Sequence, residues 1–185
     1  MPEFFTQPHG KPQVEVRGAG FTTAFGTKLA LREVAREIVD FMKAQPDRRY
    51  KVTIGTDSLQ LANKYADFVT AVVVHRVGNG GRYFYRRFEF GKFHTLRDRI
   101  LKEVLVSLDL GQAVLLELKK LLATDAFLSC VVELKWDFEI HIDVGEKGPT
   151  KQMIQEVVGM VRAHNFEPIT KPGSYAASNV ADRHV

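Results

Sequence analysis

The sequence lacks the features that mark disulfide-rich, membrane-spanning and phosphate-loop proteins. Cys130 is the only cysteine in 185 residues, so no disulfide can form within the chain, and its valine neighbours predict a buried apolar residue. No apolar run approaches the length of a membrane span. The N-terminus lacks the basic-then-apolar pattern of a secretion signal, and the glycine-rich fingerprint of a P-loop is missing. We therefore expect a cytoplasmic protein without membrane association.

The charge balance is also only mildly one-sided. The formal net charge is +4 and the sequence pI is about 9.2, while 45% of residues are hydrophobic and 26% are charged. These proportions are typical of an ordinary globular domain. The small basic excess is compatible with a polyanionic partner but does not demonstrate one.

The first half of the chain divides into an arm, a helix and three strands. Residues 1–26 are rich in proline and glycine, which predicts an arm with at most a short extended piece at Val14–Val16. The remainder, residues 27–185, is expected to form one domain that includes an extra N-terminal helix. We predict that helix at residues 28–44, strands at 50–57, 68–77 and 82–90, and a tight hairpin turn at 78–81.

The second half alternates helices and strands. A long helical region at residues 94–122 opens with a capping box formed by Thr95 and Asp98, and Gly111 is expected to kink or split it. The remaining elements are a strand at 130–144, a helix at 150–164, a strand at 166–170 and a short helix at 175–184. The strict alternation of the strand at 130–144 places Glu133, Asp137 and Glu139 on a solvated face.

Two of the predicted strands end in an aspartate. Val52 and Ile54 point to one face of the first strand, and Asp57 points to the other; Ile142 and Asp143 are arranged in the same way. If the two strands are parallel neighbours, Asp57 and Asp143 converge at one edge of the sheet. Converging carboxylates repel, so such a pair usually holds a divalent cation or shares a proton.

The element order, helix-β-β-β-helix-β-helix-β-helix, matches the ribonuclease H-like fold. Three local motifs also resemble the YkuK-like family of ribonuclease H-like proteins over residues 28–185. They are Gly55-Thr56-Asp57-Ser58, then His141-Ile142-Asp143-Val144-Gly145, and finally Lys171-Pro172 followed by Ala176-Ala177-Ser178 and Ala181-Asp182. The resemblance implies an α/β fold with a five-stranded mixed sheet of order 3-2-1-4-5, flanked by helices and preceded by the N-terminal arm and helix.

The resemblance also implies a carboxylate cluster that binds Mg²⁺ or Mn²⁺. Carried over by position, Asp57 and Asp143 would be ligands at the strand ends, and Asp182 would close the site. The helical acid of the family best matches Glu103, although Glu117 on the same helical region is a competitor. The implied activity is metal-dependent hydrolysis of phosphodiesters in nucleic acid, with RNA favoured over DNA.

Further side chains are assigned to substrate binding, each with an ordinary structural alternative. These are Ser58, His141, Arg99 and Lys102. Ser58 is also suited to capping a loop, and His141 to a hydrogen-bonded structural role. Basic residues interleave with aromatics between residues 82 and 102, which suits binding to a phosphate backbone and to bases or, equally, an ordinary exposed hairpin.

Two alternatives to a nuclease stay open at this point. One is a non-catalytic module on the same fold that binds nucleic acid or protein. The other is a scaffold that assembles into an oligomer through its N-terminal arm and helix.

Overall fold

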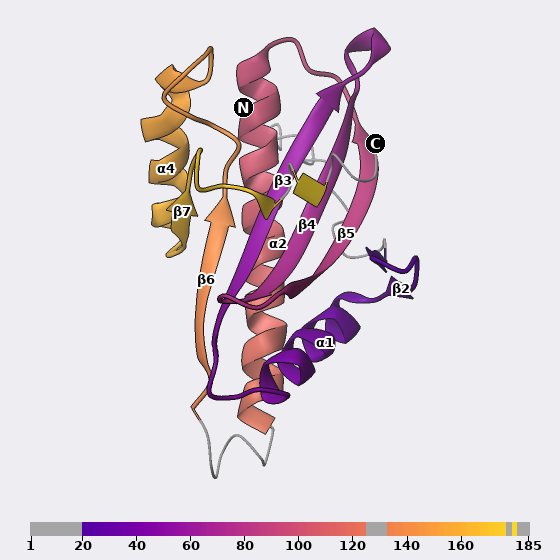
Figure 1. The fold of residues 1–185 in the computed structure, drawn as a ribbon. Coiled ribbons are helices and arrows are strands. Elements are labelled where there is room, and N and C mark those ends of the chain that lie inside the picture. The colour runs from indigo at the N-terminus through magenta and orange to yellow at the C-terminus, as the bar shows by residue number, and fades with distance from the viewer. Residues whose placement is uncertain (1–19, 125–132, 177–178, 181–185) are drawn as a thin grey trace, which may run out of the picture.

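The computed structural model describes residues 20–124, 133–176 and 179–180. Within these residues, seven strands form one mixed sheet with the order β2-β1-β5-β4-β3-β6-β7 (Figure 1). The strands are β1 (Phe21–Thr23), β2 (Lys28–Leu29), β3 (Arg49–Gln60), β4 (Ala66–Arg76), β5 (Gly81–Phe90), β6 (Lys135–His141) and β7 (Glu167–Ile169). The helices are α1 (Leu31–Lys43), α2 (Leu96–Thr124) and α4 (Ile154–Ala163), with 3₁₀ turns η1 (Ala62–Lys64) and η2 (Lys151–Met153).

The expectation of five strands in the order 3-2-1-4-5 is wrong for the sheet as a whole. The five expected strands are consecutive in the sheet as β5-β4-β3-β6-β7, and β1 and β2 extend it beyond β5. β1 comes from residues that the composition assigned to the arm. A three-residue strand carries too little alternation to be recognised, yet Phe21 is only 2% exposed and its ring packs against Arg86. The predicted extended piece at Val14–Val16 lies outside the described residues.

The two faces of the sheet are covered differently. Val52, Ile54 and Ile140 point into the main core, where α1, α2 and α4 pack on the sheet. In Figure 1, α2 runs behind the central strands along most of their length. On the opposite face, Val180 from the C-terminal segment packs against Val69 and Ala71 of β4. The side chains of Asp57 and Asp143 therefore belong to the face that the C-terminal segment covers.

Helix α2 is continuous and as long as expected, and it begins and ends two residues later than predicted. Thr95 Oγ1 accepts the backbone N–H of Asp98 at 3.0 Å, which is one of the two hydrogen bonds of the predicted capping box. Gly111 neither kinks nor splits α2. Instead, a Cβ at Gly111 would lie 2.9 Å from Ile140 Cδ1, so the missing side chain lets the helix approach β6 closely. No helix among the described residues combines the length and apolar character needed to cross a membrane.

The last predicted elements are only partly visible. β6 begins at Lys135, and residues 130–132 of the predicted strand lie outside the described part of the chain. Residues 176, 179 and 180 are helical, in agreement with the short helix expected there. Tyr175 is not helical, and the remaining positions of the expected helix, Asp182 included, lie outside the described residues.

The two central strands bring the aspartates to one edge of the sheet. β3 and β6 are parallel neighbours, with Gly55 opposite His141. Asp57 and Asp143 each follow two residues later, so both lie beyond the same end of the pair. The expectation that parallel pairing makes these carboxylates converge is therefore met by the observed register.

Candidate functional site

Three carboxylates from three separate elements influence one another at this edge. Asp57 lies on β3, Glu103 on α2 and Asp143 just after β6. Burial raises the pKa of Asp57, and the nearby charge of Asp143 raises it further. Burial likewise raises the pKa of Glu103 to about 8, with additional contributions from the charges of Asp57 and Asp143. The three carboxylates are therefore close enough to repel one another, and nearby positive charge does not fully offset this repulsion at Asp57 and Glu103.

Glu103 is fixed in this neighbourhood by Ser58 and Arg99. The carboxyl is only 5% exposed, and its Oε1 accepts a 2.5 Å hydrogen bond from Ser58 Oγ. Arg99, one turn earlier on α2, donates to Ser58 Oγ at 2.8 Å and lies 3.3 Å from Glu103 Oε1. Arg99 also donates to the backbone oxygen of Ser58. The residues predicted to bind substrate, Ser58 and Arg99, thus hold the helical acid against the end of β3.

A buried hydroxyl network beneath Glu103 fixes helix α2 on the sheet. Ser107 Oγ, one turn after Glu103, donates to Thr56 Oγ1 at 2.9 Å. Thr56 Oγ1 in turn lies 2.8 Å from Thr70 Oγ1 on β4. Thr56 belongs to a motif noted in the sequence, but Thr70 and Ser107 were not singled out there, because isolated Ser and Thr carry no periodic signal. The network links β3, β4 and α2, so it sets the position of Glu103 relative to Asp57.

Asp143 is accompanied by a lysine from the loop after β7. Lys171 Nζ lies 2.8 Å from Asp143 Oδ1, and the backbone N–H of Lys171 donates to Val144 O at 2.9 Å. The hydrogen bond to Asp143, together with the charges of Asp57 and Glu103, raises the pKa of Lys171. Lys171 belongs to a motif noted in the sequence, but no pattern there indicated that it would reach Asp143.

The donor set suits a hard divalent cation in its chemistry. Carboxylate oxygens are the ligands that Mg²⁺ and Mn²⁺ prefer, and burial together with mutual repulsion leaves these three short of positive charge. Among the residues that the structure describes, however, no three acidic or histidine side chains gather closely enough to form a ready metal site. Lys171 is bonded to Asp143, while Arg99 and Ser58 contact Glu103. Asp182, the fourth predicted ligand, lies outside the described residues.

His141 holds the start of the C-terminal segment. The ring is 4% exposed, and its Nδ1 accepts the backbone N–H of Tyr175 at 3.0 Å and that of Ala176 at 3.4 Å. Its Nε2 lies 3.3 Å from Glu139 Oε2. Since Nδ1 accepts, Nε2 carries the proton and faces the carboxylate. Burial lowers the pKa of His141, which favours this neutral form. Both ring nitrogens are therefore used within the protein.

Glu139 is buried, so its predicted place on a solvated strand face is wrong. The side chain is 9% exposed, and Lys51 Nζ lies 2.6 Å from its Oε1 while His141 occupies its other oxygen. The sequence could not indicate this burial, because the segment that covers β6 comes from 34 to 35 residues further along the chain. Asp137, one step earlier on the same face, is accessible and pairs with Arg49.

The remaining predicted residues of α2 lie at different distances from the site. Lys102 is directed to the ring of Phe90, with Nζ 4.3 Å from the ring centroid. Glu117 pairs with Lys120 at 2.7 Å and lies 14 residues beyond Glu103, which corresponds to about 21 Å along a helix. The structure therefore brings Glu103, and not Glu117, beside Asp57.

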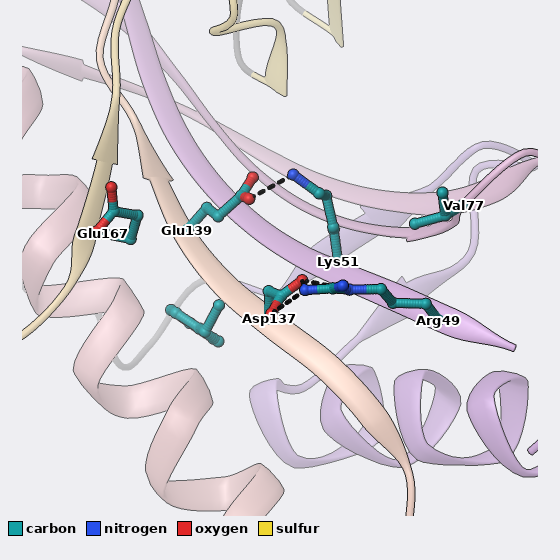
Figure 2. A pocket seen from close by; sticks show the side chains of 7 residues that line it. Arg49, Lys51, Val77, Asp137, Glu139 and Glu167 are labelled. Carbon is teal, nitrogen blue, oxygen red and sulfur yellow. Dashed lines mark hydrogen bonds and ion pairs between the residues drawn. The ribbon is translucent and has the colours of Figure 1, made fainter.

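A pocket of about 600 Å³ opens on the same face at the other end of these strands (Figure 2). Its two cations are paired, Arg49 with Asp137 and Lys51 with Glu139, and Glu167 is its third acidic residue. Lys51 is six residues before Asp57 on β3, or about 20 Å away. Because both of its cations are already paired within the pocket and it is distant from the carboxylates, we assign this pocket no part in the site.

Comparisons with known proteins agree with this arrangement. A family model described as Ribonuclease H-like matches residues 33–185. The chain is 32% identical over 158 residues to the uncharacterized protein YkuK of Bacillus subtilis (strain 168), a match that covers 84% of this chain and 91% of that protein. No solved structure matches the chain. With the order of its central strands and the carboxylates at their ends, the chain belongs to the YkuK-like family of ribonuclease H-like proteins.

Proposed function

We propose that this protein is a cytoplasmic, metal-dependent phosphodiester hydrolase that acts on nucleic acid, with RNA or RNA-containing strands as the favoured substrate. In this proposal Asp57, Glu103, Asp143 and Asp182 hold Mg²⁺ or Mn²⁺. The observation that carries it is the state of Glu103, whose pKa rises to about 8 because it is buried beside two other carboxylates. Glu103 is costly to ionise even with Arg99 beside it, so a bound divalent cation would stabilise its carboxylate form.

A bound divalent ion would activate a water molecule and stabilise the leaving oxygen of the phosphodiester. The protein's own side chains have other tasks. Ser58 and Arg99 orient Glu103, and the hydroxyls of Thr56 and Ser107 fix the helix that carries it. His141 holds the segment that leads towards Asp182. In the proposal, Lys171 gives way at Asp143 when the cation binds.

A cleavage screen with a matched pair of variants tests this function. Purified protein is incubated with RNA, DNA and RNA–DNA hybrids in Mn²⁺, in Mg²⁺ and in EDTA. Wild-type protein is expected to cleave an RNA-containing substrate only with metal, and Asp57→Asn to lose at least 100-fold in rate, or about 2.7 kcal/mol. Asp137→Asn changes the same residue type on β6 about 20 Å away, beside an accessible arginine. It is expected to cleave normally.

Cleavage that persists in EDTA, or in the Asp57→Asn protein, would contradict the proposal.

The second candidate function is a non-catalytic nucleic-acid-binding module. It is favoured by one specific observation: Lys171 and Arg99 already provide positive charge at Asp143 and Glu103. Such a module would bind nucleic acid equally well in EDTA and in the Asp57→Asn protein, without cleavage under any condition.

A further inference from the structure

An exposed tyrosine lies beyond the end of β3, the strand that carries Asp57. Tyr65 follows η1 and is 42% exposed, with its ring directly against the backbone of Gly91. A Cβ at Gly91 would lie 2.4 Å from both Cδ1 and Cε1 of the ring, so the ring can occupy this place only because residue 91 is glycine. Tyr65 is thus supported from below by backbone and open to solvent above. We call Lys64, Tyr65, Gly91, Lys92 and His94 the Tyr65 shelf.

The shelf is held together by contacts between its two loops. The backbone N–H of Phe93 donates to Lys64 O at 2.8 Å, and Lys64 Nζ lies 3.2 Å from His94 Nδ1. Phe93 is buried against Phe68, with ring centroids 5.6 Å apart, which anchors the second loop in the protein. The aromatic surface is therefore pre-ordered, and little conformational entropy is lost when a ligand covers it.

The charges on the shelf differ from those on the neighbouring hairpin and helix. Arg82, Arg87 and Arg97 each pair with a carboxylate. Lys64 and Lys92 are exposed, and within the described residues neither forms an ion pair with a carboxylate. Lys64 also has a φ of 66°, in the left-handed region where glycine or asparagine costs less. Two cations therefore flank the open ring without internal anions to neutralise them.

The shelf lies close to Asp57 along the sheet. Tyr65 O accepts hydrogen bonds from Leu61 N at 2.7 Å and from Gln60 Nε2 at 2.9 Å. Gln60 is three residues after Asp57 on β3, which corresponds to about 10 Å of strand. The nucleotides of a stacked strand are spaced by about 3.4 Å. A strand whose scissile phosphate lies at the carboxylates therefore reaches the shelf within about three nucleotides.

We propose that the Tyr65 shelf binds a single-stranded segment of the nucleic acid, with one base stacked on Tyr65 and phosphates contacting Lys64 and Lys92. This inference rests on the proposed function and narrows its substrate to strands with unpaired bases about three nucleotides from the cleaved bond. An unpaired base is required because an exposed ring can stack only on a base face that is not already covered inside a duplex.

The test measures binding without metal, so that it does not depend on catalysis. Fluorescence anisotropy in EDTA compares a labelled 12-nucleotide single strand, as RNA and as DNA, with a blunt duplex of the same sequence. We expect wild-type protein to prefer the single strand. Tyr65→Ala is expected to weaken single-strand binding by about 5- to 150-fold, because a stacked base contributes about 1–3 kcal/mol. Tyr65→Phe keeps the ring and is expected to bind within twofold of wild type.

The salt dependence separates stacking from charge. Lys64→Gly removes one cation while relieving the left-handed backbone, so it is expected to fold normally and to lower the slope of log K against log[salt] by about 0.7. Tyr65→Ala is expected to leave that slope unchanged. Matched controls are Phe25→Ala, an aromatic that is 96% exposed in the β1–β2 turn, and Lys119→Gln near the far end of α2. Both controls are expected to bind like wild type.

Two results would contradict the proposal that the Tyr65 shelf binds single-stranded nucleic acid. One is single-strand affinity that is unchanged in Tyr65→Ala. The other is a loss of affinity in Phe25→Ala equal to that in Tyr65→Ala, because binding would then follow general surface stickiness. The proposed hydrolysis is judged separately, by the Asp57→Asn cleavage screen. If the protein never cleaves but binds single strands through Tyr65, the nuclease proposal is contradicted and the shelf proposal stands. If it cleaves with metal but Tyr65→Ala binds single strands as wild type does, the shelf proposal is contradicted and the nuclease proposal stands.

Discussion

The ammonium of Lys171 lies 2.8 Å from Asp143 Oδ1, beside Asp57 and Glu103. An amine from the loop after β7 therefore sits where the proposed site needs positive charge. The side chain of Lys171 is half exposed, so its ammonium can move into solvent when a cation takes its place at Asp143. We interpret Lys171 as the protein's own counterion for the carboxylates in the absence of metal.

Replacing Lys171 with methionine is expected to strengthen metal binding. The change removes a competitor for Asp143 but keeps the length and apolar stem of the side chain. A net interaction of about 1 kcal/mol corresponds to a roughly fivefold tighter apparent affinity for Mn²⁺. The measurement is the rise of Tm with Mn²⁺ concentration, which requires no substrate. The control is Lys147→Met, an exposed lysine in the loop after β6. Equal Mn²⁺ dependence in wild type and Lys171→Met would refute the counterion role.

Glu103 should make the metal-free protein less stable as the pH rises. Below its ordinary pKa of 4.5 the carboxyl is protonated in both the folded and unfolded chain, and above about 8 it is ionised in both. Between these values the folded chain binds the extra proton, so the free energy of unfolding falls with increasing pH. Glu103→Gln removes this loss and keeps an acceptor for Ser58. We expect its free energy of unfolding at pH 8.5 to exceed that of wild type by a few kcal/mol.

The comparison is made by denaturant unfolding in EDTA at several pH values. The two proteins are expected to converge towards pH 5, where Glu103 is mostly neutral. A constant difference across this range would mean that the side chain acts through packing and not through its charge. Addition of Mn²⁺ is expected to stabilise wild type more than Glu103→Gln, because the amide is a weaker ligand than a carboxylate.

His141 is expected to control the docking of the C-terminal segment. Its Nδ1 accepts two backbone N–H groups, so His141→Leu would leave both without that acceptor at a cost of about 1–3 kcal/mol. His141→Asn keeps an acceptor near the same position and is expected to recover part of the loss. Hydrogen exchange of the amides of Tyr175 and Ala176 reports on this contact. Equal protection in wild type and His141→Leu would exclude the docking role.

The same histidine should respond to acid. Because the pKa of His141 is lowered in the folded protein, the unfolded chain binds the proton first as the pH falls below about 6.5. The stabilisation by neutral His141 is therefore present above pH 6.5 and is lost as the pH falls towards the lowered value. This pH dependence is expected to disappear in His141→Leu.

Gly91→Ala tests whether single-strand binding depends on the position of the Tyr65 ring against Gly91. The added methyl group would lie 2.4 Å from the Tyr65 ring, which must then move. We expect this variant to bind single strands as weakly as Tyr65→Ala, although it removes no atom from the ring. Anisotropy in EDTA is the measurement, and circular dichroism checks that the fold is kept. The matched change is Gly159→Ala on α4, where a methyl group would meet no atom within 4 Å. Wild-type binding by Gly91→Ala would show that the ring position is unimportant.

Most of the secondary structure followed from local patterns. The alternation in β3 and β6, the glycine turn before β5 and the apolar stripe of α2 each reflect interactions within a few residues of the chain. The two edge strands β1 and β2 did not follow, because strands of three and two residues have almost no period. They form because Phe21 and its neighbours meet β5, a partner about 60 residues away.

The site was predictable where the fold depends on strand ends, and not where it depends on tertiary contacts. Asp57 and Asp143 could be placed at one edge because parallel neighbours end together. The burial of Glu139, the bond from Lys171 to Asp143 and the approach of Tyr65 to Gly91 all join segments with unrelated patterns. Such contacts leave no periodic signal, so only three-dimensional coordinates reveal them.

Gly111 has an effect beyond its own turn of α2. Its absent side chain allows the helix to rest directly on Ile140 of β6, and Glu103 is carried two turns away on the same rigid rod. A methyl group at residue 111 would push α2 away from Ile140 and tilt the helix. The tilt would move Glu103 away from the ends of β3 and β6. The position of Glu103 relative to Asp57 and Asp143 thus depends on the absence of a side chain at Gly111, about 12 Å along the helix.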